Sequence, residues 1–252
     1  MAKIVFITGA TSGIGEACAY KFASEGYNLI LNGRKPQLLE SLAEKLSSEY
    51  KVEVLPLIFD VRDKSAAEGI VSALPEKWQS IDILINNAGL VIGVDKEFEV
   101  NLEESDIVID TNIKGLLSMT RLIVPGMIKR NKGHIINIGS IAGEAAYAGG
   151  SVYCATKAAV QMLSDGLRID LVDTPLRVTN VKPGMAETYF SITRFRGDKS
   201  KADAVYKGIQ VLTPEDIAEC VYFAASAPAH VQIADILVLP TNQATANITY
   251  RE

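Results

Sequence analysis

Tyr153 and Lys157 lie four residues apart, a spacing that places both side chains on one face of a helix. A tyrosine phenol ordinarily has a pKa near ~10 and is a poor base at neutral pH, but a nearby cation favours the phenolate. Lys157 would supply that cation. Ser140 ends the preceding apolar segment, where its hydroxyl could hold a carbonyl oxygen beside the phenol. The three residues indicate proton transfer at a carbonyl or hydroxyl group.

The same pair also fits a half-exposed aromatic beside a solvated lysine, so the surrounding elements must decide between the two interpretations. A strand is predicted at residues 134–138 and a helix at residues 151–172, which would bring Ser140 and the pair to the end of a strand. Three alanines give this helix a small-residue face that permits close helix packing: Ala155, Ala158 and Ala159.

A glycine-rich loop follows the first predicted strand, the apolar run at residues 4–7, and precedes a helix predicted at residues 16–24. Glycines let the backbone approach a pyrophosphate, while the helix start offers free N–H groups and a positive dipole end. An ordinary glycine-rich turn is the alternative. The loop residues that we expect to bind a dinucleotide are Gly9, Thr11, Ser12, Gly13, Ile14 and Gly15.

The second predicted strand, residues 27–31, runs into Arg34 and Lys35. An enzyme that uses NAD usually places a carboxylate near this point to accept from the ribose hydroxyls, and none is present here. A guanidinium and an ammonium suit a 2′-phosphate instead, which predicts NADP. The alternative is a solvated basic turn.

The third and fourth predicted strands, residues 52–59 and 81–85, also end in candidate cofactor residues. Asp60, beside Val61, could accept from an adenine amino group or cap a helix that begins near Asp63. After the fourth strand, the side-chain amides of Asn86 and Asn87 could cross-link neighbouring loops. The small residues that follow leave space for a flat ring or a ribose: Ala88 and Gly89.

A long helix is predicted from about residue 105 to 130, with a kink at Pro125. Asn112 lies within it and would ordinarily be a satisfied core asparagine, unless this helix packs beside the one that carries Tyr153. A sixth strand is predicted at residues 176–181 and a last strand at 236–239, before a tail at 240–252. The polar, basic and aromatic residues 189–204 predict a mobile flap over the site.

The chain has 252 residues, of which 22% are charged and 48% hydrophobic, and these ordinary globular values favour one α/β domain spanning residues 1–252. Its net charge of -5 argues against a nucleic-acid partner. No apolar run reaches the ~18 residues of a membrane span. The predicted strand at Ile4 leaves no room for a signal peptide, so we expect a cytoplasmic location.

The cysteines and histidines show no ligand spacing. Cys18, Cys154 and Cys220 are far apart, and we expect small buried thiols in a reducing cytosol. His134 and His230 lack partners at metal-ligand spacing, so no metal is expected.

Taken in order, these motifs resemble those of the short-chain dehydrogenase/reductase family over nearly the whole chain. The resemblance rests on the glycine loop, Asn86-Asn87-Ala88-Gly89, Asn112, Ser140, Tyr153-x-x-x-Lys157 and Pro183-Gly184. A closer similarity, to NADP-dependent 3-hydroxy acid dehydrogenases that also act on serine and allo-threonine, rests on four segments: residues 32–34, 134–140, 195–198 and 239–244.

The resemblance implies a role for each matching residue. Tyr153 would be the general acid/base, Lys157 would lower its pKa and bind the nicotinamide ribose, and Ser140 would position the substrate oxygen. Asn112 would hold a water that links Lys157 to solvent. The implied cofactor contacts are Gly9, Ser12 and Ile14 at the pyrophosphate, Arg34 and Lys35 at the 2′-phosphate, Asp60 and Val61 at the adenine, Asn86 and Ala88 at the central ribose, and Pro183, Gly184, Met185 and Thr188 at the carboxamide.

We further expect the substrate to meet Ser140, Tyr147, Tyr153, Tyr189, Phe190 and Arg194, the last as a carboxylate anchor. The implied fold is a doubly wound, Rossmann-type parallel sheet in strand order 3-2-1-4-5-6-7, and the implied assembly is a homotetramer. Two alternative functions remain: an NADPH-dependent reductase of a bulkier ketone or acyl-carrier substrate, and a non-catalytic NADP(H) sensor.

Overall fold

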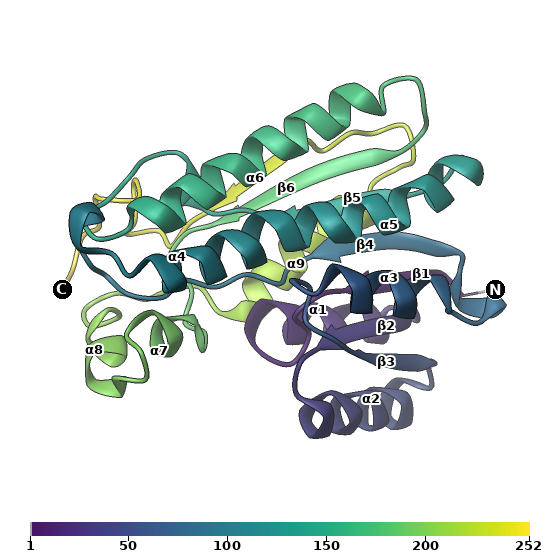
Figure 1. Ribbon diagram of the computed structural model, residues 1–252, viewed down its shortest axis with the longest axis horizontal. Helices are drawn as coiled ribbons and strands as arrows, with labels where there is room; N and C mark the ends of the chain where they lie inside the picture. Colours follow the sequence, from purple (N-terminus) through teal and green to yellow (C-terminus); the bar gives the residue numbers. More distant parts are fainter. Residues whose placement is uncertain (1) are drawn as a thin grey trace.

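A seven-stranded parallel sheet forms the centre of the computed structural model, which describes residues 2–252 (Figure 1). Its strand order is β3-β2-β1-β4-β5-β6-β7, as predicted, and every neighbouring pair is parallel. The strands are β1 (Ile4–Ile7), β2 (Asn28–Gly33), β3 (Val54–Ile58), β4 (Ile81–Asn86), β5 (His134–Ile138), β6 (Arg177–Pro183) and β7 (Asp235–Val238).

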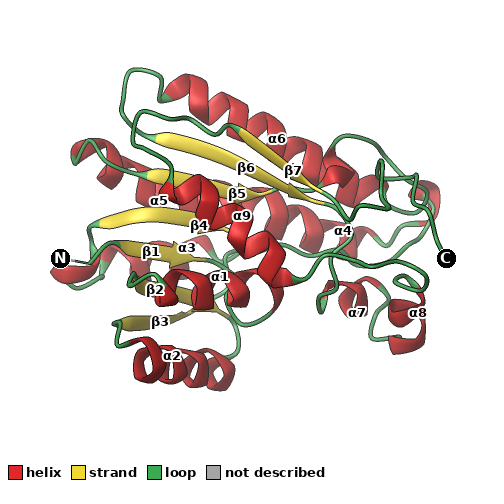
Figure 2. Cartoon of the chain, turned by 180° about the vertical axis from the view of Figure 1, so that it is seen from behind, coloured by secondary structure: helices red, strands yellow, loops and turns green. Residues whose placement is uncertain are grey.

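Helices cover both faces of the sheet (Figure 2). They are α1 (Gly13–Ser24), α2 (Pro36–Tyr50), α3 (Lys64–Ser72), α4 (Leu102–Ile109), α5 (Leu116–Lys129), α6 (Ser151–Asp170), α7 (Phe190–Arg194), α8 (Lys199–Ala204) and α9 (Pro214–Ser226). Because side chains alternate along a strand, Val5 and Ile7 pack with α1, α2 and α9, whereas Ile4 and Phe6 pack with α3 and α5. The central strands are therefore buried on both sides, as their unbroken apolar runs predict.

The helix predicted at residues 105–130 is divided at a different place from the one expected. A π-helical turn, Asp110–Gly115, separates α4 from α5, and α5 continues past Pro125 to Lys129. At the end of this turn, a Cβ on Gly115 would lie 2.8 Å from a methyl group of Val61, so only glycine permits this approach to the β3 loop. A π turn adds a residue to the helical repeat and often marks a functional site.

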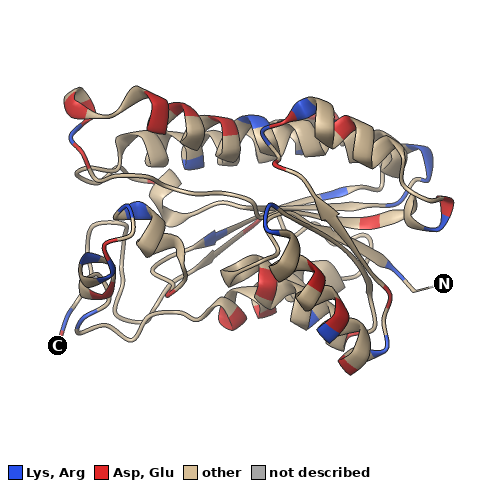
Figure 3. Ribbon diagram, turned by 60° about the horizontal axis from the view of Figure 1, so that its bottom comes forward, with Lys and Arg blue, Asp and Glu red and all other residues tan. Residues whose placement is uncertain are grey.

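The flap segment and the tail lie at the same end of the molecule, where Figure 1 places α7, α8 and the C-terminus together. The expected flap at residues 189–204 contains α7 and α8, and Arg196 between them has a left-handed backbone, with φ of 52°. Basic and acidic residues are interspersed over the ribbon rather than gathered into one basic face (Figure 3). No helix in the described part of the chain combines the length and apolar character needed to cross a bilayer.

Candidate active site

A cavity of about 760 Å³ opens at the carboxyl ends of the central strands, where ligands collect in doubly wound sheets. The structure brings most of the predicted site residues to its wall, although they come from loops across the whole sequence. Those that line it are Gly9, Thr11, Ser12, Gly13, Ile14, Arg34, Lys35, Asp60, Val61, Ala88, Gly89, Ser140, Tyr147, Tyr153, Lys157, Pro183, Gly184, Met185, Thr188, Tyr189, Phe190 and Arg194.

Two predicted cofactor residues lie behind this wall instead. The Asn86 side chain donates to Asn137 Oδ1 at 2.9 Å and to Thr120 Oγ1 at 3.2 Å, so it joins β4 to β5 and α5 in the core. Gly15 packs against the loop itself, since a Cβ there would lie 2.4 Å from both Asn87 Nδ2 and the Gly9 carbonyl oxygen. Both residues support the loops that line the cavity, and their predicted contacts with a cofactor stay predictions.

The glycine loop is held open by Thr8 and by Asn87, one of the amides expected to cross-link neighbouring loops. Asn87 Nδ2 donates to the carbonyl oxygens of Thr8 and Gly9 at 2.9 and 3.0 Å. The Thr8 hydroxyl accepts from the backbone N–H groups of Asn87 and Ala88, both at 3.0 Å. Gly9 and Gly13 adopt left-handed φ values of 64° and 58°. The loop is thus fixed in its curved shape by β4.

The start of α1 faces this loop without a side-chain cap. Ser12 occupies the position before the helix, yet its side chain makes no capping hydrogen bond. Free N–H groups and the positive end of the helix dipole therefore remain available at the cavity, which is the arrangement that binds a phosphate.

Arg34 adds a cation to the wall of the cavity. Its Nη1 lies 3.6 Å from Asp60 Oδ2, and its side chain is 59% exposed. Arg62 holds the same carboxylate more closely, with Nη2 at 2.7 Å. Burial alone would raise the pKa of Asp60, but the hydrogen bonds from Arg62 outweigh it and hold the pKa below its usual value. Asp60 is therefore already neutralised by Arg62, and most of the donors of Arg34 remain free.

Asp60 does not cap the following helix. Asp63 does so instead, because its side chain accepts from the N–H of Ala66 at 3.0 Å. Of the two roles considered for Asp60, the structure removes the cap and leaves its place on the cavity wall.

Tyr153 and Lys157 are both buried on α6, and Lys157 Nζ lies 5.8 Å from the centre of the Tyr153 ring. The ammonium donates to the Ile138 carbonyl oxygen at 2.7 Å. Burial lowers the pKa of Lys157 to about 8. Burial also raises the pKa of the Tyr153 phenol above its ordinary value of 10; the neighbouring Tyr147 adds to this rise, and Ser140 opposes it.

Burial of the phenol is the dominant effect on the Tyr153 pKa here, and the lowering of this pKa by Lys157 stays a prediction. The ammonium is bound to the end of β5, and the loss of water around the phenol dominates over the charges near it. Tyr153 is consequently a protonated donor at neutral pH.

Ser140 is placed beside the phenol by the turn that follows β5. Its Oγ accepts from the N–H of Ala142 at 3.1 Å and lies 3.5 Å from the Pro183 carbonyl oxygen. Only weak contacts occupy its own proton, so the hydroxyl can turn to donate toward an oxygen in the cavity.

Asn112, in the π turn, joins the loop after β4 to α6. Its Nδ2 donates to the Leu90 carbonyl oxygen at 2.9 Å and to Thr156 Oγ1 at 3.0 Å, and its Oδ1 accepts from the Leu90 N–H at 2.8 Å. A Cβ on Gly89 would lie 3.3 Å from this Oδ1 and 3.6 Å from Lys157 Nζ, so both groups border the same glycine. Asn112 is a satisfied core asparagine that also fixes the helix carrying Tyr153.

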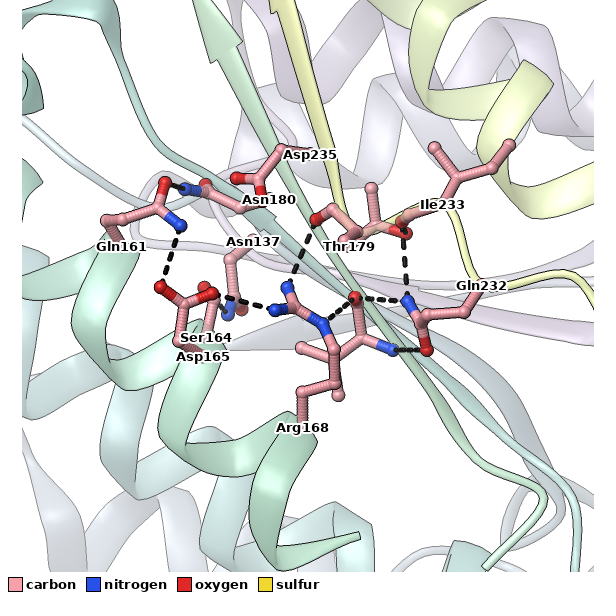
Figure 4. Close-up of polar contacts among 12 residues, drawn as sticks. Asn137, Gln161, Ser164, Asp165, Arg168, Thr179, Asn180, Gln232, Ile233 and Asp235 are labelled. Atoms are coloured by element: carbon pink, nitrogen blue, oxygen red, sulfur yellow. Dashed lines mark hydrogen bonds and ion pairs between the residues drawn. The ribbon is translucent and has the colours of Figure 1, made fainter. Parts of the chain in front are cut away.

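A polar network fixes the rest of α6 on the sheet (Figure 4). One series of contacts runs from Asn180 through Gln161 and Asp165 to Arg168, and a separate pair joins Asn137 to Ser164. Together they hold α6 on β5 and β6. The links are Asn137 to Ser164 at 2.9 Å, Asn180 to Gln161 at 2.8 Å, Gln161 to Asp165 at 3.0 Å and Arg168 to Asp165 at 2.7 Å.

The flap adds an aromatic and cationic cover. The Phe190 ring lies 5.2 Å from that of Tyr153 at an interplanar angle of 61°. The Arg194 guanidinium lies 5.0 Å from the centre of the Tyr147 ring, and its buried Nε has no hydrogen-bond partner among residues 2–252. A cation is therefore held on aromatic rings in the cavity with donor capacity unused.

The tail contributes residues that the sequence analysis missed. Gln243 accepts from the Met185 N–H at 2.8 Å, and its Oε1 would lie 2.4 Å from a Cβ on Gly184. Other tail residues that line the cavity are Ala246, Asn247, Thr249 and Arg251. The segment at residues 239–244 carried part of the resemblance, and that was the one available signal for this contact.

Comparison with known proteins gives consistent results. The sequence model described as "short chain dehydrogenase" matches residues 3–199. An NADP-dependent 3-hydroxy acid dehydrogenase of Schizosaccharomyces pombe is 47% identical over 251 residues, covering 99% of this chain and 97% of that protein. Sulfoacetaldehyde reductase 2 of Chromohalobacter salexigens is 44% identical, with coverage of 97% and 96%. The closed form of a serine dehydrogenase complexed with NADP+ superposes with a TM-score of 0.92 at 43% identity, covering 99% of each chain.

Proposed function

Since the chain belongs to the short-chain dehydrogenase/reductase family, we propose that it is an NADP-dependent oxidoreductase acting on the 3-hydroxyl of a short 3-hydroxy acid or hydroxy amino acid, of the serine and allo-threonine type. The observation that carries this proposal is the composition of the cavity, whose wall combines the Arg34 guanidinium with Ser140, Tyr153 and Arg194. Similarity to 3-hydroxy acid dehydrogenases over nearly the full length supports it.

The residues present fit NADP. The uncapped start of α1 and the left-handed glycines would hold the pyrophosphate, and Arg34 with Lys35 would hold the 2′-phosphate. Gly89, with no side chain, leaves the cavity wall open in front of Lys157 Nζ, which would meet the nicotinamide ribose. NADP, when bound, supplies or accepts the hydride.

Residues of the chain transfer the proton and hold the substrate oxygen. In oxidation, the C3–H bond breaks with its electron pair leaving as hydride, and the hydroxyl proton passes to the Tyr153 oxygen as the carbonyl forms. Ser140 donates to the same oxygen and keeps it beside the phenol. Because the Tyr153 pKa is raised, the phenol is ready to donate in reduction and must lose its proton before oxidation. Lys157 lies behind this pair and would pass that proton toward solvent through a water held beside Asn112.

Arg194 is the proposed anchor for the acid group. It is the cation of the flap that lines the cavity, and its Nε has no partner among residues 2–252. Tyr189 and Phe190 would close over the carbon chain beside it. Arg194→Ala should raise the KM for 3-oxopropanoate, the carbonyl form of 3-hydroxypropanoate, and spare neutral propanal. An equal effect on both substrates would mean that Arg194 organises the flap.

A second candidate substrate, a small sulfonated aldehyde, is favoured by the 44% identity to sulfoacetaldehyde reductase 2. A sulfonate would present oxygen acceptors and one negative charge to Arg194, as a carboxylate does. The bulkier ketone and acyl-carrier alternatives and the NADP(H) sensor have no comparable support.

We also propose that residues 1–252 form one cofactor-binding and catalytic unit, with 189–204 as its flap and 240–252 as its tail, working as a homotetramer in the cytoplasm. Exposed apolar side chains on several helices and on β7 support the assembly, because contacts between subunits would cover them. They are Leu102, Met162, Ile169, Phe223 and Leu237. The free cysteines fit a reducing compartment.

A substrate panel tests the proposal. Purified enzyme is assayed for NADP+ reduction with serine, allo-threonine and 3-hydroxypropanoate, and for NADPH oxidation with sulfoacetaldehyde, a bulky cyclic ketone and propanal. We expect turnover of the short acids, with NAD(H) much poorer in each case. Turnover of the bulky ketone alone would refute the substrate class, and NADPH binding without any turnover would favour the sensor.

A further inference from the structure

Two arginines of the flap, Arg194 and Arg196, are separated by one residue yet serve opposite sides of it. Arg194 ends α7 and lines the cavity. Arg196 has a left-handed backbone, with φ of 52°, and is exposed. This backbone reversal closes the helix, because the Arg196 N–H donates to the Thr193 carbonyl oxygen at 3.0 Å. It also sends the second guanidinium away from the cavity.

Arg196 lies instead between two carboxylates. Its Nη2 is 2.5 Å from Asp95 Oδ2 and 2.6 Å from Glu104 Oε2, and its Nε donates to Glu104 Oε1 at 2.9 Å. Asp95 and Glu104 keep only 35% and 26% of their side chains exposed. One guanidinium thus compensates two partly buried carboxylates from the loop after β4 and from α4. The cluster keeps an excess of one negative charge.

The acidic pair is close to the backbone that carries Arg194. The Gly93 N–H donates to the Arg194 carbonyl oxygen at 2.9 Å, and a Cβ on Gly93 would lie 2.6 Å from Asp95 Oδ2 and 2.8 Å from Arg196 Nη2. Arg194 itself is held in the cavity by the faces of Tyr147 and Phe195, at 5.0 and 5.7 Å, contacts that are weak beside an ion pair. Without Arg196, the Asp95 and Glu104 carboxylates would be uncompensated and would attract the Arg194 guanidinium.

We propose that Arg196 is a positioning residue that occupies the Asp95/Glu104 pair and thereby leaves Arg194 free to bind the acid group of the substrate. The proposal rests on the proposed function in one respect, the acidic substrate. The backbone reversal after α7 places Arg196 at the Asp95/Glu104 pair and leaves Arg194 at the cavity. Arg196 touches neither substrate nor cofactor and acts only through Arg194.

The test compares Arg196→Ala with the triple variant Arg196→Ala/Asp95→Asn/Glu104→Gln in the full-length enzyme. Arg196→Ala should raise the KM for 3-oxopropanoate about tenfold, the loss of one charge-assisted contact, and leave the kcat and the KM for propanal within about twofold. Removing both carboxylate charges should restore the KM, because nothing then attracts Arg194. Lys201→Ala is the control and should change neither KM, because it removes a flap cation that is paired with Asp198 alone among residues 2–252, at 3.3 Å.

A rise in KM that the triple variant fails to reverse would overturn the proposal, since Arg196 would then be a structural tether of the flap. An unchanged KM in Arg196→Ala would overturn it as well. Phenylglyoxal labelling of Arg194, followed by peptide mass spectrometry, gives a readout without substrate. Labelling should slow in Arg196→Ala and recover in the triple variant, and this holds even if the enzyme proves inactive on 3-hydroxy acids. Failure of the proposed function is therefore distinguishable from failure of this inference.

Discussion

Arg34→Ala should weaken NADPH binding and leave NADH binding nearly unchanged. Arg34 follows β2 at the edge of the cavity and is 59% exposed, with Asp60 Oδ2 3.6 Å from its Nη1. Arg62 holds the same carboxylate at 2.7 Å, so Asp60 keeps a partner after the substitution. The change therefore removes donors from the cavity without leaving a buried charge uncompensated.

The magnitude follows from the kind of contact that is lost. A hydrogen bond to a charged group is worth about 1.5–3 kcal/mol, which corresponds to roughly 10- to 150-fold in Kd. Because more than half of the Arg34 side chain is exposed, water screens part of this energy, and we expect a loss near tenfold. NADH, which has no 2′-phosphate, should change by less than about twofold.

Fluorescence titration of NADPH and NADH at low and high salt measures these affinities directly. Wild-type affinity for NADPH should fall with salt more steeply than that of Arg34→Ala, because one screened charge pair is missing in the variant. Arg34→Lys is the matched control, since it keeps the charge but not the forked donors, and it should lose less. Equal losses for NADPH and NADH would show that Arg34 shapes the loop and would refute the reasoning.

Three further predictions concern the proton-transfer pair and the assembly. Tyr153→Phe should lower kcat by ~10²- to 10⁴-fold with an unchanged Kd for NADPH, and an active Tyr153→Phe enzyme would contradict the mechanism. The rate of oxidation by the wild type should rise with pH, because the raised Tyr153 pKa keeps the phenol protonated at lower pH. Burial lowers the pKa of Lys157 from 10.5 to about 8, so its charge opposes folding by about 3 kcal/mol below pH 8, and this cost fades as pH rises toward 10.5. In urea titrations, the free energy of unfolding of the wild type should therefore rise relative to that of Lys157→Met between pH 8 and 10.5. A difference that stays constant with pH would refute the lowered Lys157 pKa. Light scattering should give four times the monomer mass of 27.2 kDa, and a monomer at micromolar concentration would refute the tetramer.

The fold and the position of the site could be predicted because both follow from repeating patterns. Apolar runs separated by helix-length segments define a parallel sheet, and the carboxyl ends of its strands meet at one edge. The glycine loop, Arg34 and Ser140 each follow a strand, so their convergence on one cavity was expected. The four-residue spacing of Tyr153 and Lys157 placed both on one face of α6.

Local details that depend on a single residue could not be predicted. Asn86 and Asn87 are adjacent amides, but the alternation along β4 turns the first into the core and the second toward the glycine loop. The π turn at Asp110–Gly115 adds one residue to a helix, which hydrophobic periodicity does not detect. Gln243 and Met185 are 58 residues apart in the sequence, and no local pattern predicts their contact.

The most direct measurement of the central claim follows one deuterium atom. Serine deuterated at C3 is incubated with NADP+ and the wild-type enzyme, and the nicotinamide product is analysed by mass spectrometry. The account predicts monodeuterated NADPH from the wild type and almost none from Tyr153→Phe. Turnover that yields only unlabelled NADPH, or labelled NADPH formed equally well by Tyr153→Phe, would contradict transfer of hydride from C3 assisted by the Tyr153 phenol.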